Sequence, residues 1–104
     1  MNIQKMMKQA QKMQQDMQAK QEQLAQETVE ATVGGGKIKV TANGTGEVLA
    51  ISISPDVVDP EDTEMLEDLI LSGVKQAIAE GKQRSEEELG KMTSGLGLPP
   101  GMGL

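Results

Sequence analysis

The stretch ETVEATVGGGKIKVTANGTGEVLAISIS, residues 27–54, decides the fold of this 104-residue chain. Apolar and polar residues alternate within three short runs, which is the pattern of strands with one buried face. The segments GGG at 34–36 and NGTG at 43–46 separate the runs, and glycine and Asn-Gly supply the positive φ angles that hairpin turns require. The apolar face is expected to carry Val29, Ala31, Val33, Ile38, Val40, Ala42, Leu49, Ile51 and Ile53. The pattern predicts a three-stranded antiparallel meander, which needs a cover on that face.

A helix is predicted before the meander. Apolar or small residues recur there in steps of three and four, a heptad pattern that is typical of a helix packed against another helix. Lys20 is the one interruption between residues 3 and 24. We expect four of these positions to form a packing seam that also serves a dimer: Met6, Met13, Met17 and Leu24.

A second helix is predicted after the meander. Asp59-Pro60 predicts its N-cap and its first helical position. An apolar stripe at helical spacing then runs from Leu66 to Ile78. Because the stripe thins after Gly81, the first half of the helix should cover the sheet, and the second half should project or pair elsewhere.

The chain is small and its core-forming residues are few. Ile, Leu and Val together number 22, aromatic residues are absent and eight Met fill part of the gap. Methionine packs flexibly and specifies a core weakly, so we expect a subunit interface to complete the core. The expected architecture is α+β: helix, three-stranded antiparallel meander, helix, in one αβββα domain over residues 1–93 that forms a homodimer. Residues 94–104 are rich in Gly and Pro and are expected to be a mobile tail.

Most residue types that catalysis requires are missing. Cysteine and histidine are absent, which removes disulfides, thiolate metal ligands and imidazole catalysis. The segment GGGK at 34–37 lacks the Ser or Thr of a phosphate-binding Walker loop, because isoleucine follows and opens a strand. The acidic residues between 56 and 68 match no calcium-loop spacing. We therefore expect no enzyme, no cofactor, no metal and no small-molecule substrate.

Membrane and export signals are not expected either. No apolar run approaches the roughly 18 residues that a membrane span needs. The lysines near the start are not followed by the apolar segment of a secretory signal. We expect a protein of the cytoplasm with no membrane partner.

Charge is organised on the first predicted helix. Lys5, Lys8 and Lys12 fall within roughly 60° of one another on a helix of 3.6 residues per turn, opposite the packing seam. Residues 1–20 are positive, although the chain has a net charge of −6. Lysine and glutamine can contact phosphates and base edges, or they can simply cover a solvated helix face. Since aromatic residues for base stacking are absent, a nucleic-acid partner would be duplex DNA held mainly by its backbone.

Four segments together resemble the YbaB/EbfC family of bacterial nucleoid-associated proteins, in family order. They are MMKQAQKMQQDM, GGGKIKVTANGTGEVLAISISP, EMLEDLI and GLGLPPG. The resemblance implies a homodimer with projecting helical arms that binds DNA in the nucleoid, organises it and influences gene expression. It also implies the DNA-binding residues, which are Lys5, Lys8 and Lys12 on the first helix and Lys82 and Arg84 on the second.

We therefore predict a homodimer that binds duplex DNA with little sequence specificity. An alternative is a protein-interaction module, in which the Met-rich helical arms grip a partner protein, because exposed methionines suit adaptable protein surfaces.

Overall fold

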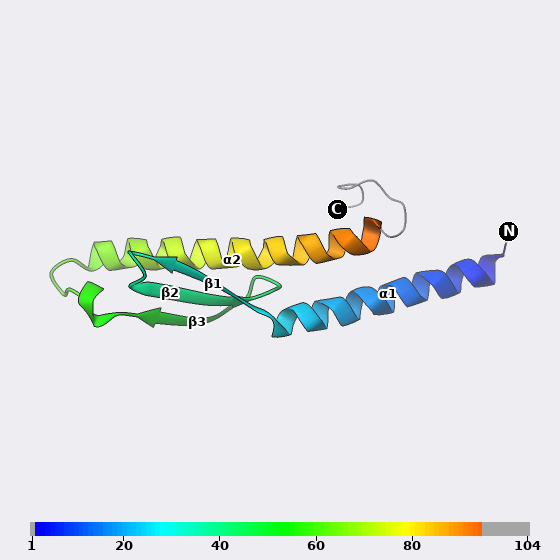
Figure 1. Cartoon of the computed structure of the whole chain (residues 1–104), viewed down its shortest axis with the longest axis horizontal. Coiled ribbons are helices and arrows are strands. Elements are labelled where there is room, and N and C mark those ends of the chain that lie inside the picture. The colour runs from blue at the N-terminus through cyan, green and yellow to red at the C-terminus, as the bar shows by residue number, and fades with distance from the viewer. Residues whose placement is uncertain (1, 95–104) are drawn as a thin grey trace.

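The computed structural model describes residues 2–94 (Figure 1). The predicted α+β order of helix, three strands and helix is confirmed, with one turn of 3-10 helix, η1, before the last helix. The elements are α1 (Ile3–Gln26), β1 (Thr28–Val33), β2 (Ile38–Asn43), β3 (Val48–Ile53), η1 (Pro55–Val57) and α2 (Thr63–Ser94). Of the tail predicted for 94–104, only Ser94 is described, and it ends α2. The rest of that prediction lies outside the described residues.

The three strands form an antiparallel sheet in the order β1-β2-β3. The turn between β1 and β2 is made by the glycine triplet at 34–36, whose φ angles are all positive, so this segment is the predicted hairpin. In the second turn the positive φ lies at Gly46, not at Asn43 or Gly44 as the Asn-Gly signal suggested. Asn43 organises this turn, because its Oδ1 accepts hydrogen bonds from the N–H groups of Thr45 and Glu47 and from the Thr45 hydroxyl.

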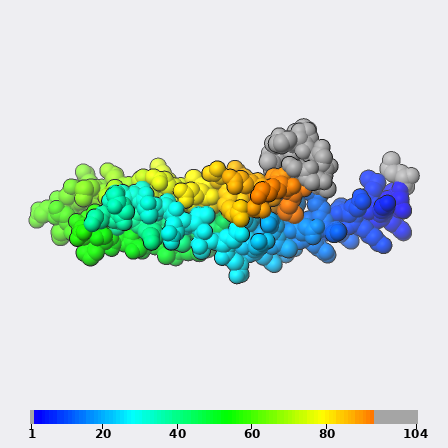
Figure 2. All heavy atoms as spheres, viewed as in Figure 1, coloured from blue at the N-terminus to red at the C-terminus, as the bar shows by residue number. Residues whose placement is uncertain are grey.

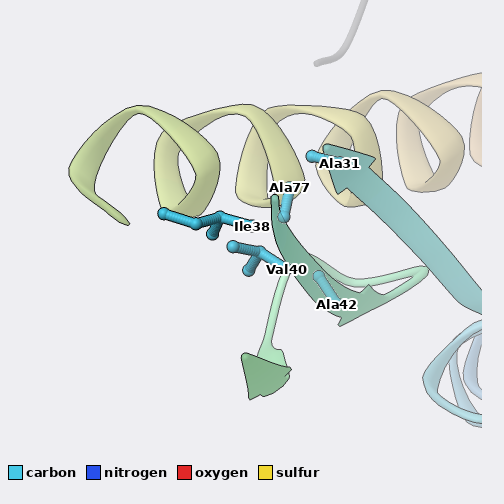
Figure 3. Close-up of a cluster of buried hydrophobic side chains, with 5 residues drawn as sticks. All are labelled: Ala31, Ile38, Val40, Ala42 and Ala77. Atoms are coloured by element: carbon cyan, nitrogen blue, oxygen red, sulfur yellow. The ribbon is translucent and has the colours of Figure 1, made fainter. Parts of the chain in front are cut away.

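The core lies between the sheet and the first half of α2 (Figure 3). Ile38, Val40 and Ala42 alternate along β2 and are fully buried, and Ala31 of β1 and Ala77 of α2 complete the cluster. Partly buried apolar side chains surround it: Val29, Val33, Val48, Val57, Leu66, Leu69, Ile70 and Val74. The prediction that the first half of the second helix covers the sheet is confirmed.

Strand β3 extends beyond this cover. Ile51 and Ile53 pair with core residues of β2, yet they are 44% and 38% exposed. A register shift pairs Ala42 with Val48, so Val48 packs beside the core. Leu49, which was expected on the buried face, is 52% exposed instead.

Helix α2 begins at Thr63, later than the predicted start at Pro60. Asp59 does not cap the helix. Its side chain accepts a hydrogen bond from the N–H of Glu61 at 2.9 Å, and its carbonyl accepts one from Asp62 at 3.0 Å. Asp-Pro therefore starts a β-turn, a role for which these residues are equally suited. Asp62 is the helix cap, since its Oδ1 accepts from the N–H of Met65 at 3.3 Å.

Helix α1 runs beside the second half of α2 and gives the molecule dimensions of 71 × 23 × 16 Å (Figure 1). Leu24 is 1% exposed and anchors the base of α1, where its carbonyl accepts a hydrogen bond from Gly44 at 2.9 Å. A Cβ at Gly44 would lie 2.7 Å from that carbonyl oxygen, and one at Gly81 would collide with the carbonyl of Asn43. Both glycines therefore permit backbones to approach closely, which brings α1, α2 and the second turn together.

Candidate nucleic-acid interface

The N-terminal half of α1 forms a basic arm, which we define as residues 3–12. Asn2 caps it, because its Oδ1 accepts a hydrogen bond from the N–H of Lys5 at 3.1 Å. Every residue of the basic arm is exposed, including Lys5, Lys8 and Lys12. The tip of the arm extends well past the described end of α2 (Figure 2). The three lysines thus share one accessible face of a projecting helix.

The predicted packing seam is only partly covered within the chain. Leu24 is buried, and Met13 and Met17 are half-buried. Met6 is 55% exposed, since it lies on the part of α1 that α2 does not reach. The role of these residues in a dimer stays a prediction.

An open groove of about 450 Å³ lies between α1 and the end of α2. Its lining residues are Gln9, Lys12, Met13, Asp16 and Met92. These described residues provide one cation, one anion, one amide and two thioethers, which do not form a concentrated set of groups for catalysis or for a cofactor.

The two predicted DNA-binding cations of α2 have different surroundings. Lys82 is exposed and its stem lies over the turn between β2 and β3, where its Cγ is 2.9 Å from the position of a Cβ at Gly46. Arg84 is engaged within the chain. Its Nε and Nη2 donate to the two carboxylate oxygens of Glu27 at 3.1 and 3.3 Å, and its Nη1 donates to Glu88 at 2.6 Å. A DNA contact by Arg84 would therefore exchange a carboxylate for a phosphate, and that contact stays a prediction.

Glu88 is the centre of a group of ion pairs that joins α1 to α2. Its Oε2 lies 3.1 Å from the Lys20 ammonium, and its Oε1 lies 2.6 Å from Arg84 and 3.4 Å from Lys91. The hydrogen bond from Lys20 and the neighbouring positive charges lower the pKa of Glu88 to about 2. The hydrogen bond with Glu27 is the main reason that the pKa of Arg84 is raised.

Sequence reasoning missed the ion pairs around Glu88. Arg84 and Lys91 stand four residues before and three residues after it, a spacing that brings side chains together on a helix and was a usable signal. The partnership with Lys20 had no such signal, because that residue belongs to a different helix.

Three of the acidic residues before α2 form an ion pair, a turn and a helix cap. Asp56 pairs with Lys37 at 2.7 Å, and Asp59 and Asp62 accept backbone N–H groups. Within residues 2–94, no three acidic side chains lie where they could hold a metal ion together. No helix in that range is long and apolar enough to cross a membrane.

Comparison with known proteins relates this geometry to a family. The model of the YbaB/EbfC DNA-binding family matches residues 1–96. A nucleoid-associated protein of Pelotomaculum thermopropionicum is 50% identical over 98 residues, which cover 94% of this chain and 93% of that protein. Another nucleoid-associated protein, from Akkermansia muciniphila, is 50% identical over 103 residues, which cover 99% of this chain and 99% of that protein.

The fold is also shared with a solved structure. The crystal structure of an uncharacterized protein from Helicobacter pylori superposes with a TM-score of 0.69 at 21% identity, over 92% of this chain and 97% of that one. That likeness concerns the fold alone, whereas the match in sequence shows that the chain belongs to the YbaB/EbfC DNA-binding family.

Proposed function

We propose that the protein binds duplex DNA as a nucleoid-associated homodimer, through the basic arm of each subunit. The observation that carries the proposal is the exposure of Lys5, Lys8 and Lys12 on one face of a helix that extends past the described end of α2 (Figure 2). Lysine ammonium groups bind phosphates without reading bases. Little sequence specificity follows from this chemistry.

The acidic charge of the chain is compatible with DNA binding at the basic arm. The acidic segment at 56–68 lies around η1 and the start of α2, at the opposite end of the molecule from the arm (Figure 1). The molecule is 71 Å long, whereas salt screens charges over about 8 Å at physiological ionic strength. The electrostatic interaction of DNA at the basic arm is therefore far stronger with the local lysines than with the carboxylates of residues 56–68.

Exposed apolar residues support the homodimer. Leu49, Ile51 and Ile53 of β3 and Val58 just after η1 are between 38% and 52% exposed. Strand β3 is also an edge of the sheet, with backbone groups available for pairing. A second copy on this surface would complete the thin core and would double the number of arms, which increases avidity without new contacts.

The proposed biological role is to organise DNA in the cytoplasmic nucleoid and to influence gene expression there. A protein that binds with little specificity organises DNA and influences the expression of many genes at once. The relatives from Pelotomaculum and Akkermansia are named nucleoid-associated proteins, which supports this location. The alternative of a protein-interaction module is not favoured, because the matching family is a DNA-binding family, and we propose no catalytic activity.

The test is a mobility-shift titration of duplex DNA over a range of salt concentrations. Lys8→Gln with Lys12→Gln should weaken binding about tenfold or more and reduce the salt slope by about 0.9 for each phosphate that the variant no longer binds. The matched control, Lys37→Gln with Lys39→Gln, makes the same change of charge on β2 and the preceding turn.

The control should change affinity by less than about twofold, because its lysines make no proposed phosphate contact. Equal losses in both double variants would show that the basic arm is not the DNA site. The same assay on Lys82→Gln and on Arg84→Gln tests the two predicted contacts of α2.

A further inference from the structure

Glu88 is a carboxylate that is only 8% exposed, on the face of α2 that meets α1. A charge withdrawn from water is costly unless it is paired. Both oxygens of Glu88 are paired, one with Lys20 of α1 and the other with Arg84 and Lys91 of α2. Glu88 thus binds the helix that carries the basic arm.

Lys20 occupies the one position that interrupts the predicted packing seam. The heptad pattern favours an apolar residue there, because a lysine buries less apolar surface against the neighbouring helix. The lysine is half-buried, and its ammonium lies 3.1 Å from Glu88. The interruption of the seam therefore provides an ion pair between two helices.

Within the described residues, two ion pairs and one buried leucine hold the last turns of α1 to the rest of the chain, and Met13 and Met17 are half-buried nearer to the basic arm. Glu27, which caps the C-terminus of α1, binds Arg84, and Leu24 is buried. Both lie at the joint between α1 and β1. Along the helix axis, Lys20 lies roughly 6 Å beyond Leu24 and roughly 10 Å beyond Glu27, at a rise of about 1.5 Å per residue. A rigid helix that is held at its joint and otherwise only by flexible methionine side chains can pivot, whereas an ion pair along its length fixes its direction.

We propose that Glu88 is the positioning residue of the basic arm: by holding Lys20, it fixes the direction in which α1 projects. The consequence for DNA rests on the function proposed above, but the direction of the arm does not. A pivot of about 20° at the joint would displace Lys5 by roughly 10 Å, given the length of helix between them. A hydrogen bond to a phosphate spans about 3 Å, so a pivoting arm would lose its alignment with DNA.

The direction of the arm can be measured without DNA. The chain has no cysteine, so Gln4→Cys on the arm and Gln76→Cys on α2 give a clean pair of spin-label sites, both exposed. Labelled chains are diluted into an excess of unlabelled ones, so that the distance within one chain is read whatever the oligomeric state. The protein with Glu88 intact should give one narrow distance distribution.

Glu88→Gln should shift the mean distance by about 5–10 Å or double the width of the distribution, as a pivot at the joint requires. Glu86→Gln is the matched control, since it makes the same change of charge at an exposed position on the same helix. It should leave the distribution unchanged. An unchanged distribution in Glu88→Gln would overturn the proposal.

A second variant protects the test against misfolding of the first. Lys20→Gln removes the partner on α1 and leaves Glu88 paired with Arg84 and Lys91. It should reproduce the shift, and the double variant Lys20→Gln with Glu88→Gln should add nothing, because both changes break one interaction. Additive shifts would mean that the two residues act independently and would overturn the proposal. Helical content by circular dichroism establishes that each variant is folded.

The DNA readout separates positioning from simple charge. Glu88→Gln makes the chain less negative, so a purely electrostatic role predicts tighter binding to duplex DNA. Loss of alignment predicts the opposite, a weakening of about threefold or more as fewer phosphates are bound. Tightening in Glu88→Gln equal to that in Glu86→Gln would overturn the positioning role in DNA binding while leaving the proposed function intact. If the intact protein failed to bind DNA, the proposed function would fall, and the distance measurement would still decide the role of Glu88.

Discussion

Gly81 allows α2 to pack closely against the turn between β2 and β3. An added Cβ there would collide with the carbonyl oxygen of Asn43 and would lie 2.7 Å from the Cα of Gly46. Both neighbours are backbone atoms of the turn between β2 and β3. Asn43 holds that turn with three hydrogen bonds, so moving the turn backbone away from α2 would cost free energy. At this position the lack of a side chain is a requirement of packing.

Gly81→Ala should therefore destabilise the protein, although alanine favours helix. The gain in helix propensity is at most about 1 kcal/mol, whereas overpacking against a fixed backbone costs about 1–3 kcal/mol or more. Chemical denaturation followed by circular dichroism measures the net change.

Gly90→Ala on the same helix is the control. A Cβ at Gly90 would meet no described atom within 4 Å beyond its chain neighbours and the backbone of its own helix, so this variant should gain up to about 1 kcal/mol. The two substitutions are thus expected to have opposite signs. Stabilisation by both would mean that α2 does not lie as close to the turn as the structure shows.

At the scale of elements, the contact between α1 and α2 depends on ion pairs as well as on apolar packing. Glu27 and Glu88 bind three cations between them, and Leu24 supplies the buried apolar anchor. Such a contact responds to acid, because protonation of a carboxylate removes its charge. The sheet beneath the first half of α2 has an apolar core and does not share this sensitivity.

The pH dependence of stability should reveal Glu88. Its pKa is lowered from 4.5 to about 2 in the folded protein, so its ion pairs stabilise the fold fully above pH 4.5, and that contribution is lost as the pH falls toward 2. The difference in urea midpoint between the parent protein and Glu88→Gln should therefore shrink over this range. Glu86→Gln provides the comparison, and its midpoint should follow that of the parent protein. A constant difference for Glu88→Gln would show that Glu88 does not act through its charge.

The sequence predicted elements well because their signals are periodic. Alternation in the strands and the stripe on α2 identify the sheet and its cover, and the buried residues are those expected on β2. The predicted start of α2 at Pro60 was wrong, because Asp-Pro suits a β-turn as well as a helix N-terminus. The ion pair between Lys20 and Glu88 was out of reach for another reason. It depends on how two helices lie against each other, which periodicity within either helix does not encode.

At the scale of the whole molecule, the chain has two unlike ends and an incompletely covered sheet. The basic arm lies at one end, and the acidic turns before α2 lie at the other (Figure 1). Between them, β3 presents apolar side chains at an unpaired edge. This surface is where we expect the second subunit.

Ile51→Asp should raise the dissociation constant of the homodimer by more than about tenfold, because a carboxylate would be withdrawn from water at the interface. Thr28→Asp on the opposite edge strand, β1, is the matched control and should leave the dimer intact. Sedimentation velocity with interference optics suits a chain without aromatic residues, and a monomer has a mass of 11.1 kDa. A dimer equally stable in both variants would place the interface elsewhere.

The elongated shape also sets a scale for the DNA itself. A long axis of 71 Å equals about two turns of B-form helix, or roughly twenty base pairs. A shorter fragment cannot reach both ends of one chain at once. The dependence of binding affinity on DNA fragment length therefore distinguishes DNA that crosses only the tip of the protein from DNA that lies along its long axis.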